Sequence, residues 1–442
     1  MEVIIDVHTH TFNAMDIPLK GYLLSRKYKG ILKHLAPLLI PGIAACIRGK
    51  VDSANKKNLF HRIFGPVALE FVCRIFGKEY KNWSKTLSKN IADLTSEMIE
   101  TFEKDNIGLY VPLMIDFEYW FKSTLDNPIK NQIDTIYQDI IIPYKGKIHP
   151  FVAFDPAREL AFRKGMTNPD GEPEEDGSMK LVRDAIENKG FIGVKLYNAM
   201  GYRPINNNIV DEKRKKIPLH KKKYKFNGEE YDKVLTELYD YCIEFGVPIT
   251  THCGMDGSEP YKDASFDFGH AIFWRDVLGQ QKYQNLHLNL AHFGWNKQDG
   301  HIGNRSWVRE ICEMVSKFDH LYTDVSHHEV ILDEKKSLFT TAYQQLLNDF
   351  PEIKNKILFG IDWHVIKRVA NFENFKKRYI EILKSDNLFS DQAIEDFLGR
   401  NALKFLGLLP GEKNRARLEK FYHKHSITPP EWFETTAEVM KI

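Results

Sequence analysis

His8 and His10 stand two residues apart just beyond a short apolar segment, Val3–Val7. Residues two apart on a strand point to the same side, so both imidazoles would face one space. Neutral imidazole is a good ligand for Zn2+ and similar cations, and two ligands on one strand reduce the cost of ordering a site. Taken alone, the pair is also compatible with two histidines on the surface.

Polar residues with ligand chemistry follow three more apolar segments. His252 follows Val247–Thr251, His292 follows Leu286–Ala291, and Asp362 closes a segment that starts at Ile357. A single histidine at a strand end can simply bond a carbonyl, and a single aspartate there can cap a helix. The recurrence of such residues at four strand ends favours a metal site.

Eight apolar segments would carry these residues, and helical patterns fill the gaps between them. The eight segments are Val3–Val7, Gly108–Met114, His149–Phe154, Phe191–Leu196, Val247–Thr251, Leu286–Ala291, Leu321–Val325 and Ile357–Ile361. Near-continuous apolar runs of this length are typical of parallel strands buried on both faces. The alternation predicts an α/β fold, a (β/α)8 TIM barrel, whose active site lies at the C-terminal ends of the strands. An open doubly wound sheet is the rival, but no G-x-G-x-x-G motif follows the first segment.

The remaining length is predicted to decorate one barrel domain that spans residues 1–442. Residues 13–106 form a helical insertion after the first strand, and residues 410–442 form a C-terminal extension. Arg163–Ser178 is an acidic, Gly/Pro-rich loop, and Asn198–Gly228 is a basic one. All the segments that follow strands would lie on the active-site face, where substrate specificity is encoded.

Composition excludes several classes of protein. The 442 residues carry 62 Lys and Arg against 60 Asp and Glu, a formal net charge of +2, which gives no reason to expect a nucleic-acid partner. Five cysteines without a C-x-x-C pair fit a reducing, cytoplasmic compartment. The N-terminus has no signal-peptide pattern, and the longest apolar run, Leu35–Ile47, is too short for a membrane span. A homodimer is expected because dimers are the commonest soluble oligomers.

Seven motifs together resemble the amidohydrolase superfamily, in particular its amidohydrolase-2 and aminocarboxymuconate-semialdehyde decarboxylase-like branch. They are Asp6–His10, Gly193–Leu196, Thr251–Gly254, Leu290–His292, Tyr322–Ser326, Phe359–Trp363 and Gly399–Gly407. The resemblance implies that His8, His10, His252 and Asp362 bind a divalent metal ion. It also implies that Asp362 shuttles a proton from a metal-activated water, and that His292 polarises the substrate or binds a second metal.

Lys195 has two readings. In binuclear members of the superfamily a lysine at the end of the fourth strand is carbamylated and bridges two metals, whereas in mononuclear members it is structural or faces the substrate. We favour one ion, Zn2+ before Mn2+ or Fe2+, and expect Asp6 to pair with the buried lysine. Arg203 is a candidate for binding a substrate carboxylate, because its planar guanidinium suits bidentate contacts. His327 or His328 could recognise the substrate, and at most one would point inward because adjacent residues on an extended chain diverge. We favour the interpretation that both are solvated loop residues.

The leading prediction is hydrolysis of a C–N or C–O bond in a small molecule, such as an amide, lactone or ester, and an anionic substrate is compatible with it. The alternative is a lyase, a nonoxidative decarboxylase or hydratase of an unsaturated or aromatic acid, because the same ligands would stabilise its developing negative charge. A noncatalytic barrel that serves as a scaffold is the third reading. Intact ligand positions disfavour it.

Overall fold

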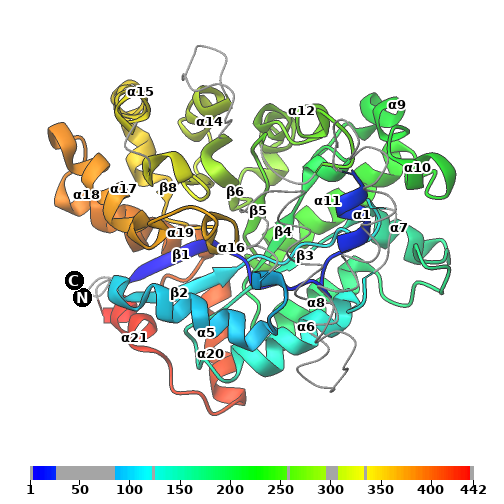
Figure 1. Ribbon diagram of the computed structural model, residues 1–442, viewed down its shortest axis with the longest axis horizontal. Coiled ribbons are helices and arrows are strands. Elements are labelled where there is room, and N and C mark those ends of the chain that lie inside the picture. Colours follow the sequence, from blue (N-terminus) through cyan, green and yellow to red (C-terminus); the bar gives the residue numbers. More distant parts are fainter. Residues whose placement is uncertain are drawn as a thin grey trace.

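The computed structural model describes residues 3–25, 85–121, 125–255, 259–294, 307–332 and 336–438. Within them, eight strands alternate with helices (Figure 1). The strands are β1 (Ile4–Thr9), β2 (Ile107–Pro112), β3 (Phe151–Ala153), β4 (Gly193–Leu196), β5 (Ile249–Thr251), β6 (Leu288–Leu290), β7 (Leu321–Asp324) and β8 (Ile357–Leu358). Each lies within or overlaps one of the eight predicted segments, and the predicted strands are therefore confirmed.

All the paired strands run parallel and follow one another in sequence order. β1 pairs with β2, and β3 to β8 form a six-stranded sheet. Backbone hydrogen bonds also join the two sheets. The Met114 N–H donates to the Phe151 carbonyl at 3.0 Å beside β3, and the Val7 N–H donates to the Phe359 carbonyl at 3.1 Å beside β8. These contacts confirm an α/β fold with a parallel arrangement of strands.

The strands of the six-stranded sheet are short, with two to four residues each. Nearly every strand residue is buried on both faces, as a parallel sheet covered by helices requires. The buried apolar side chains of strands and helices form one continuous core. The strands therefore form a rigid base for the polar residues at their C-terminal ends.

The helices between the strands match the predicted pattern. They include α5 (Ile91–Thr101), α6 (Ile129–Ile136), α7 (Pro156–Arg163), α8 (Ser178–Asn188), α11 (Gly228–Phe245), α14 (Trp307–Val315), α15 (Lys336–Asp349), α16 (Trp363–Ile366), α17 (Phe375–Lys384) and α19 (Asn401–Leu406). Helix α11 shows how the sequence sets such limits. Asn227 and Glu230 form a capping box at its start, and Gly246 ends it at a positive φ of 62°, a conformation that glycine adopts without strain.

The extra segments differ in how far the structure tests them. Most of the predicted insertion, residues 26–84, lies outside the described residues, and its described ends hold α1 (Leu19–Ser25) and α5. The basic segment is not a plain loop. It contains the short helices α9 (Asp211–Arg214) and α10 (Pro218–Lys222), because Pro218 starts α10 and Arg214 anchors α9 to the Gly201 carbonyl at 2.8 Å.

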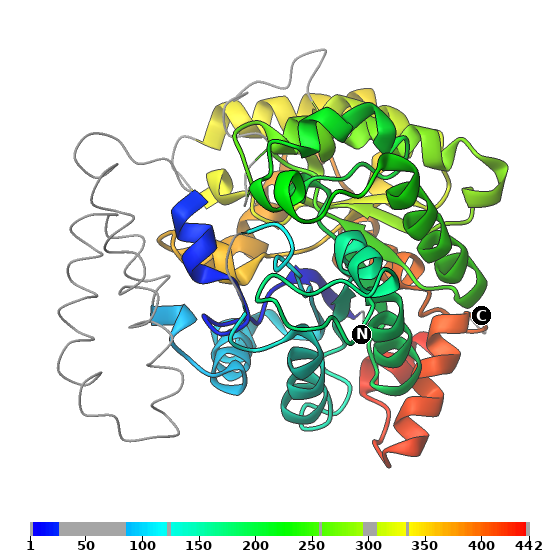
Figure 2. The same cartoon turned by 90° about the vertical axis from the view of Figure 1, so that its right-hand side faces the viewer.

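The C-terminal extension forms α20 (Lys413–Lys424) and α21 (Glu431–Glu438), coloured red at the lower edge of the molecule in Figures 1 and 2. Asn414 donates to the Ile192 carbonyl, which precedes β4, at 2.7 Å, and Tyr422 contacts His149, which precedes β3, at 2.7 Å. The extension therefore packs against the N-terminal side of the strands. Across the described ranges, none of the helices combines the length and apolar character that crossing a membrane requires.

Candidate metal centre

Five strands bring polar side chains to one region at their C-terminal ends. His8 lies in β1 and His10 directly follows it, while His252, His292 and Asp362 follow β5, β6 and β8. All five side chains are buried, with no residue more than 5 % exposed. The sequence-predicted residues are therefore brought together, joined by Asp324 at the end of β7.

His8 is held so that one ring nitrogen is left for a ligand. Its Nδ1 lies 3.0 Å from Asp324 Oδ2. An ionised carboxylate can only accept a hydrogen bond, so Nδ1 of His8 carries the proton that it donates. Its Nε2 is buried and has no hydrogen-bond partner among the described residues. A carboxylate that fixes Nδ1–H and leaves the Nε2 lone pair available is the usual support of a metal-binding histidine.

His10 has the same arrangement with a different acceptor. Its Nδ1 lies 2.7 Å from the Leu113 carbonyl, so Nδ1 carries the proton and Nε2 carries the lone pair. Nε2 lies 3.6 Å from Asp362 Oδ1. Burial lowers the pKa of His10 to about 3, despite the attraction of Asp362, and so keeps the ring neutral and suited to binding a cation.

Asp362 faces His10 with an oxygen that is buried and, within the described ranges, without a hydrogen-bond donor. Burial by itself would raise the pKa of Asp362, but the hydrogen bond from His327 and the nearby His10 and His8 hold it below its ordinary value. The side chain is therefore an ionised carboxylate. His8, His10 and Asp362 have ligand atoms within 4.8 Å of one another, and this donor set fits a divalent cation.

Two other groups meet the same distance criterion. One is His8, His292 and Asp324, and the other is His292, His327 and Asp362. The Asp324 oxygens already accept hydrogen bonds from His8, from Asn289 Nδ2 at 2.7 Å and from the His292 N–H at 3.1 Å. His8, together with hydrogen bonds from Ser326 and Asn289, holds the pKa of Asp324 below its ordinary value, although burial opposes this. Asp324 thus positions the histidines rather than offering a lone pair to a metal.

His252 and His292 form a pair beside this group. His252 Nδ1 lies 3.2 Å from His292 Nε2, and Ser326 Oγ lies 2.9 Å from His292 Nδ1. Burial lowers the pKa of both rings, and the charges of Lys195 and His8 lower them further. The ring of Tyr197 stacks on His252 with 4.2 Å between centroids. His252 is outside the three candidate ligand groups of the described residues, and its role as a ligand stays a prediction.

Lys195 lies in β4 and is buried, and its Nζ has no hydrogen-bond partner in the described part of the chain. The predicted pairing with Asp6 is wrong. The Asp6 carboxylate instead accepts the N–H groups of His8 at 3.1 Å and Ile361 at 3.0 Å, because it bridges the backbones of β1 and the segment after β8. Burial lowers the pKa of Lys195 to about 8, and the negative charges of Asp324 and Asp362 oppose this shift.

Other predicted residues lie elsewhere. Arg203 Nε donates to the Asp267 carbonyl at 3.0 Å, and the guanidinium lies 3.7 Å from the ring centroid of Phe273, so these contacts direct it to the loop after β5. The prediction that His327 and His328 are solvated is wrong. His328 is 1 % exposed and contacts the His292 carbonyl at 2.9 Å, while His327 contacts Asp362.

Three residues of the site were not assigned from the sequence: Asp324, Ser326 and His327. Asp324 and Ser326 are two residues apart at the end of a strand, which is the spacing that drew attention to His8 and His10. That pattern was a usable signal, but nothing local indicated that Asp324 would reach His8, 316 residues away in the sequence.

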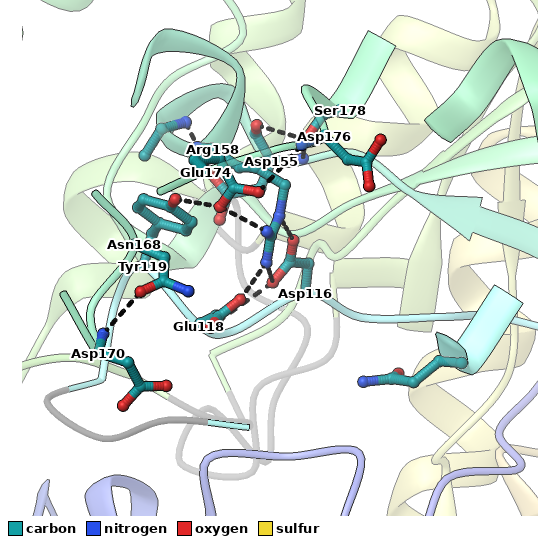
Figure 3. A network of polar contacts seen from close by, with 12 residues as sticks. Asp116, Glu118, Tyr119, Asp155, Arg158, Asn168, Asp170, Glu174, Asp176 and Ser178 are labelled. Atoms are coloured by element: carbon teal, nitrogen blue, oxygen red, sulfur yellow. Dashed lines mark hydrogen bonds and ion pairs between the residues drawn. The ribbon is translucent and has the colours of Figure 1, made fainter. Parts of the chain in front are cut away.

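A buried ionic network fixes the loops beside the centre (Figure 3). Arg158 of α7 donates to Asp116 at 2.6 Å, to Glu174 at 2.8 Å and to Glu118, and thereby joins the loop after β2 to the acidic segment. Phe117 lies between two of these carboxylates in sequence, and its ring contacts Tyr197 at 5.3 Å between centroids. The network therefore holds the aromatic residues that pack against His252.

No curated protein matches the sequence. Among solved structures, a proposed metal-dependent hydrolase from Lactobacillus casei is 14 % identical, with 92 % of this chain and 95 % of that chain covered and a TM-score of 0.46. An amidohydrolase from Burkholderia multivorans with bound zinc is 10 % identical, with 73 % and 91 % covered and a TM-score of 0.42. Amidohydrolase 2 from Bifidobacterium longum subsp. infantis is 12 % identical, with 92 % and 99 % covered and a TM-score of 0.40. Likeness at this level gives no information about the reaction.

The family model for amidohydrolases gives the stronger result. It matches residues 144–408, which include His252, His292, Asp324 and Asp362 and make up more than half of the chain. The protein is thus an enzyme, and its chain belongs to the amidohydrolase family.

Proposed function

We propose that the protein is a metal-dependent hydrolase that cleaves a C–N or C–O bond of a small molecule. One divalent cation, with Zn2+ favoured, would be held by His8, His10 and Asp362, with His252 as a further ligand. The observation that carries this proposal is that His8 and His10 have the same ring nitrogen, Nδ1, next to a hydrogen-bond acceptor. Both have Nδ1 fixed by an acceptor, so both direct an Nε2 lone pair toward the region of Asp362.

We also propose that the eight strands close into a (β/α)8 barrel, as one domain. The backbone hydrogen bonds between β1 and the segment that includes β8, and between the β2 and β3 regions, support this closure. In such a barrel the polar residues that follow the strands converge at one mouth. The cation and the catalytic side chains would share that mouth.

A cation bound there supplies Lewis acidity, which lowers the pKa of a water molecule and polarises a carbonyl oxygen. Asp362 would accept the proton of the attacking water and return it to the leaving group, since its buried carboxylate is ionised. His292 would stabilise the negative charge that develops on the substrate oxygen. The buried ammonium group of Lys195 would bind an anionic part of the substrate.

A decarboxylase or hydratase is the second candidate, and Lys195 is the observation that favours it. A buried cationic side chain whose Nζ has no hydrogen-bond partner in the described structure suits a substrate carboxylate. In a decarboxylase this carboxylate would leave as CO2, whereas in a hydrolase it would only anchor the substrate.

Metal analysis of the purified protein tests the metal, and isotope labelling tests the reaction. We expect close to one equivalent of zinc per chain in the wild type and a large loss in a His8→Ala/His10→Ala variant. As a control, His320→Ala removes a half-buried histidine that precedes β7, at the opposite end of that strand, and should keep the metal.

The reaction is then followed in H2 18O with panels of amides, esters, lactones and unsaturated acids. Incorporation of 18O into the carboxyl group that forms when an amide, ester or lactone is cleaved identifies a hydrolase. CO2 release, or 18O in a new hydroxyl group of an unsaturated acid, without turnover of amides, esters or lactones identifies a lyase. Wild-type protein that binds no divalent metal would overturn the proposal. Two ions per chain, with Lys195 carbamylated, would replace the single-ion site with a binuclear one.

A further inference from the structure

We infer that His327 and Arg368 are positioning residues that orient the Asp362 carboxylate, so that Oδ1 rather than Oδ2 is presented to the cation. This inference rests on the proposed metal site. The residues form a chain of contacts after β7 and β8. Glu329 accepts from Arg368 Nη2 at 3.1 Å, Arg368 Nη2 lies 3.2 Å from His327 Nε2, and His327 Nδ1 lies 3.3 Å from Asp362 Oδ2.

Arg368 determines which nitrogen of His327 carries the proton. A guanidinium has only N–H donors and stays charged, so the nitrogen it contacts must accept. In neutral His327 the lone pair is then on Nε2 and the proton is on Nδ1. The Nδ1–H group can donate to Asp362 Oδ2, which is the one hydrogen-bond direction that satisfies both neighbours.

This contact divides the two oxygens of Asp362 between different tasks. Oδ2 accepts from His327, whereas Oδ1 faces His10 Nε2 at 3.6 Å and has no hydrogen-bond partner in the described ranges. Without the His327 contact, the carboxylate could rotate about its Cβ–Cγ bond and exchange the two oxygens. His327 therefore fixes the ligand atom before a cation arrives.

The same argument excludes His292, His327 and Asp362 as a second metal site, although their ligand atoms lie within 4.8 Å of one another. A histidine must direct a lone pair at a metal. In His327 the Nδ1 lone pair is occupied by a proton, and Nε2 faces a guanidinium that would repel a cation. The structure thus assigns His327 to the support of the metal ligands.

The backbone agrees with a special role for this pair of residues. His327 and Asp362 both have positive φ angles, 65° and 57°, in the left-handed region that non-glycine residues seldom occupy. Such conformations persist where the surrounding structure holds them, and they cluster at functional sites. Here the left-handed conformations of His327 and Asp362 accompany side chains that contact each other.

A merely structural role makes a different prediction. The Arg368–Glu329 pair is 38 % and 15 % exposed, and exposed ion pairs contribute little to stability. If the chain of contacts only braced the loop, its removal would change unfolding slightly and metal affinity not at all. If it orients Asp362, metal affinity falls while the fold remains.

The test uses the full-length protein and two variants that both tolerate a positive φ. His327→Gly removes the donor, whereas His327→Asn keeps an N–H close to the position of Nδ1. Zn2+ affinity is measured by competition with a chelator, and thermal unfolding is followed in parallel. We expect His327→Gly and Arg368→Met to weaken Zn2+ binding about 10- to 100-fold, the usual effect of losing a residue that supports metal ligands.

His327→Asn should restore most of the affinity, and Arg378→Met, which removes an exposed arginine of α17 that pairs with Glu381, should have no effect. Equal Zn2+ affinity for the wild type, His327→Gly and Arg368→Met would overturn the inference. Nitrogen-15 NMR of histidine-labelled, metal-free protein separates this outcome from failure of the proposed function. The inference is supported, even without metal, if His327 carries its proton only on Nδ1 in the wild type and on both Nδ1 and Nε2, as a mixture of tautomers, in Arg368→Met. A proton on Nε2 in the wild type overturns it.

Discussion

Replacing Asp324 by asparagine changes one atom in a side chain whose two oxygens both accept hydrogen bonds. The carboxylate accepts five hydrogen bonds, from His8 Nδ1, Asn289 Nδ2, the N–H groups of His292 and Ser326, and Ser326 Oγ. The new amide has a single acceptor oxygen, so its NH2 group must face donors in either orientation.

The two orientations differ in free energy. With NH2 at the Oδ1 position, the N–H groups of His292 and Ser326 lose their acceptor, at a cost of about 1–3 kcal/mol each. With NH2 at the Oδ2 position, His8 can respond by moving its proton from Nδ1 to Nε2. Asn289 can turn its amide, because its Oδ1 has no hydrogen-bond partner among the described residues. The second orientation is therefore favoured.

In that orientation His8 Nε2 carries a proton and cannot bind a metal. We expect Asp324→Asn to lower Zn2+ affinity about 10- to 100-fold, the usual effect of changing a residue that supports a metal ligand. The free energy of unfolding of the metal-free protein should fall by about 1.5–3 kcal/mol, the value of a hydrogen bond to a charged group. Chelator competition and urea unfolding measure the two quantities.

Asp319→Asn serves as the control, because it makes the same chemical change at an exposed position just before β7. It should alter neither quantity. Histidine NMR of the Asp324→Asn variant should find the His8 proton on Nε2. Unchanged metal affinity together with a proton that stays on His8 Nδ1 would refute the reasoning, because the carboxylate would then have no part in setting the tautomer.

Two further predictions concern stability. Arg158→Met leaves Asp116, Glu118 and Glu174 buried together without their cation and should destabilise the protein by about 3–5 kcal/mol, as breaking a buried ion pair does. Urea unfolding measures this loss, and the control Arg378→Met, at an exposed ion pair with Glu381, should lower the free energy of unfolding by less than about 1 kcal/mol. Burial raises the pKa of Asp16 to about 6 in the folded protein, despite hydrogen bonds from Asn13 and Asn127. The folded state therefore holds this proton to higher pH than the unfolded state. As the pH rises from about 4 to about 6, the contribution of Asp16 to the free energy of unfolding falls by about 3 kcal/mol at most, and it stays low at higher pH. Asp16→Asn should remove this fall. Unfolding of both proteins is measured at pH 4 and pH 7, and an equal change in the free energy of unfolding between these pH values in the wild type and the variant would contradict the prediction.

Strand positions were predictable because burial on both faces leaves a continuous apolar pattern in the sequence. The segments Leu286–Ala291 and Leu321–Val325, for example, contain β6 and β7. His8, His10 and Asp362 could be singled out because each follows or ends such a segment. A ligand residue at a strand end can be predicted from a few neighbouring residues, because the apolar segment and the polar residue after it are adjacent in the sequence.

The supporting residues could not be found in this way. Asp324 acts on His8 across 316 residues, and His327 reaches Asp362 through a left-handed turn that no local pattern indicated. Asp6 was a candidate partner for Lys195 because it shares a strand face with His8, but Asp6 Oδ1 accepts the backbone N–H groups of His8 and Ile361 instead. Which donor satisfies a buried carboxylate is decided by three-dimensional packing, and a sequence lists all the candidates equally.

The junction between β1 and the segment that includes β8 has a consequence for the protein's motions. His8 and His10 belong to the first strand, and Asp362 follows the last, so the proposed ligands stand on opposite sides of this junction. The Asp362 N–H donates to the His8 carbonyl at 2.7 Å across it. A cation held by both sides would link the first and the last of the eight described strands. Loading with metal would then slow the local opening of this junction, and the amide hydrogens there would exchange with solvent more slowly.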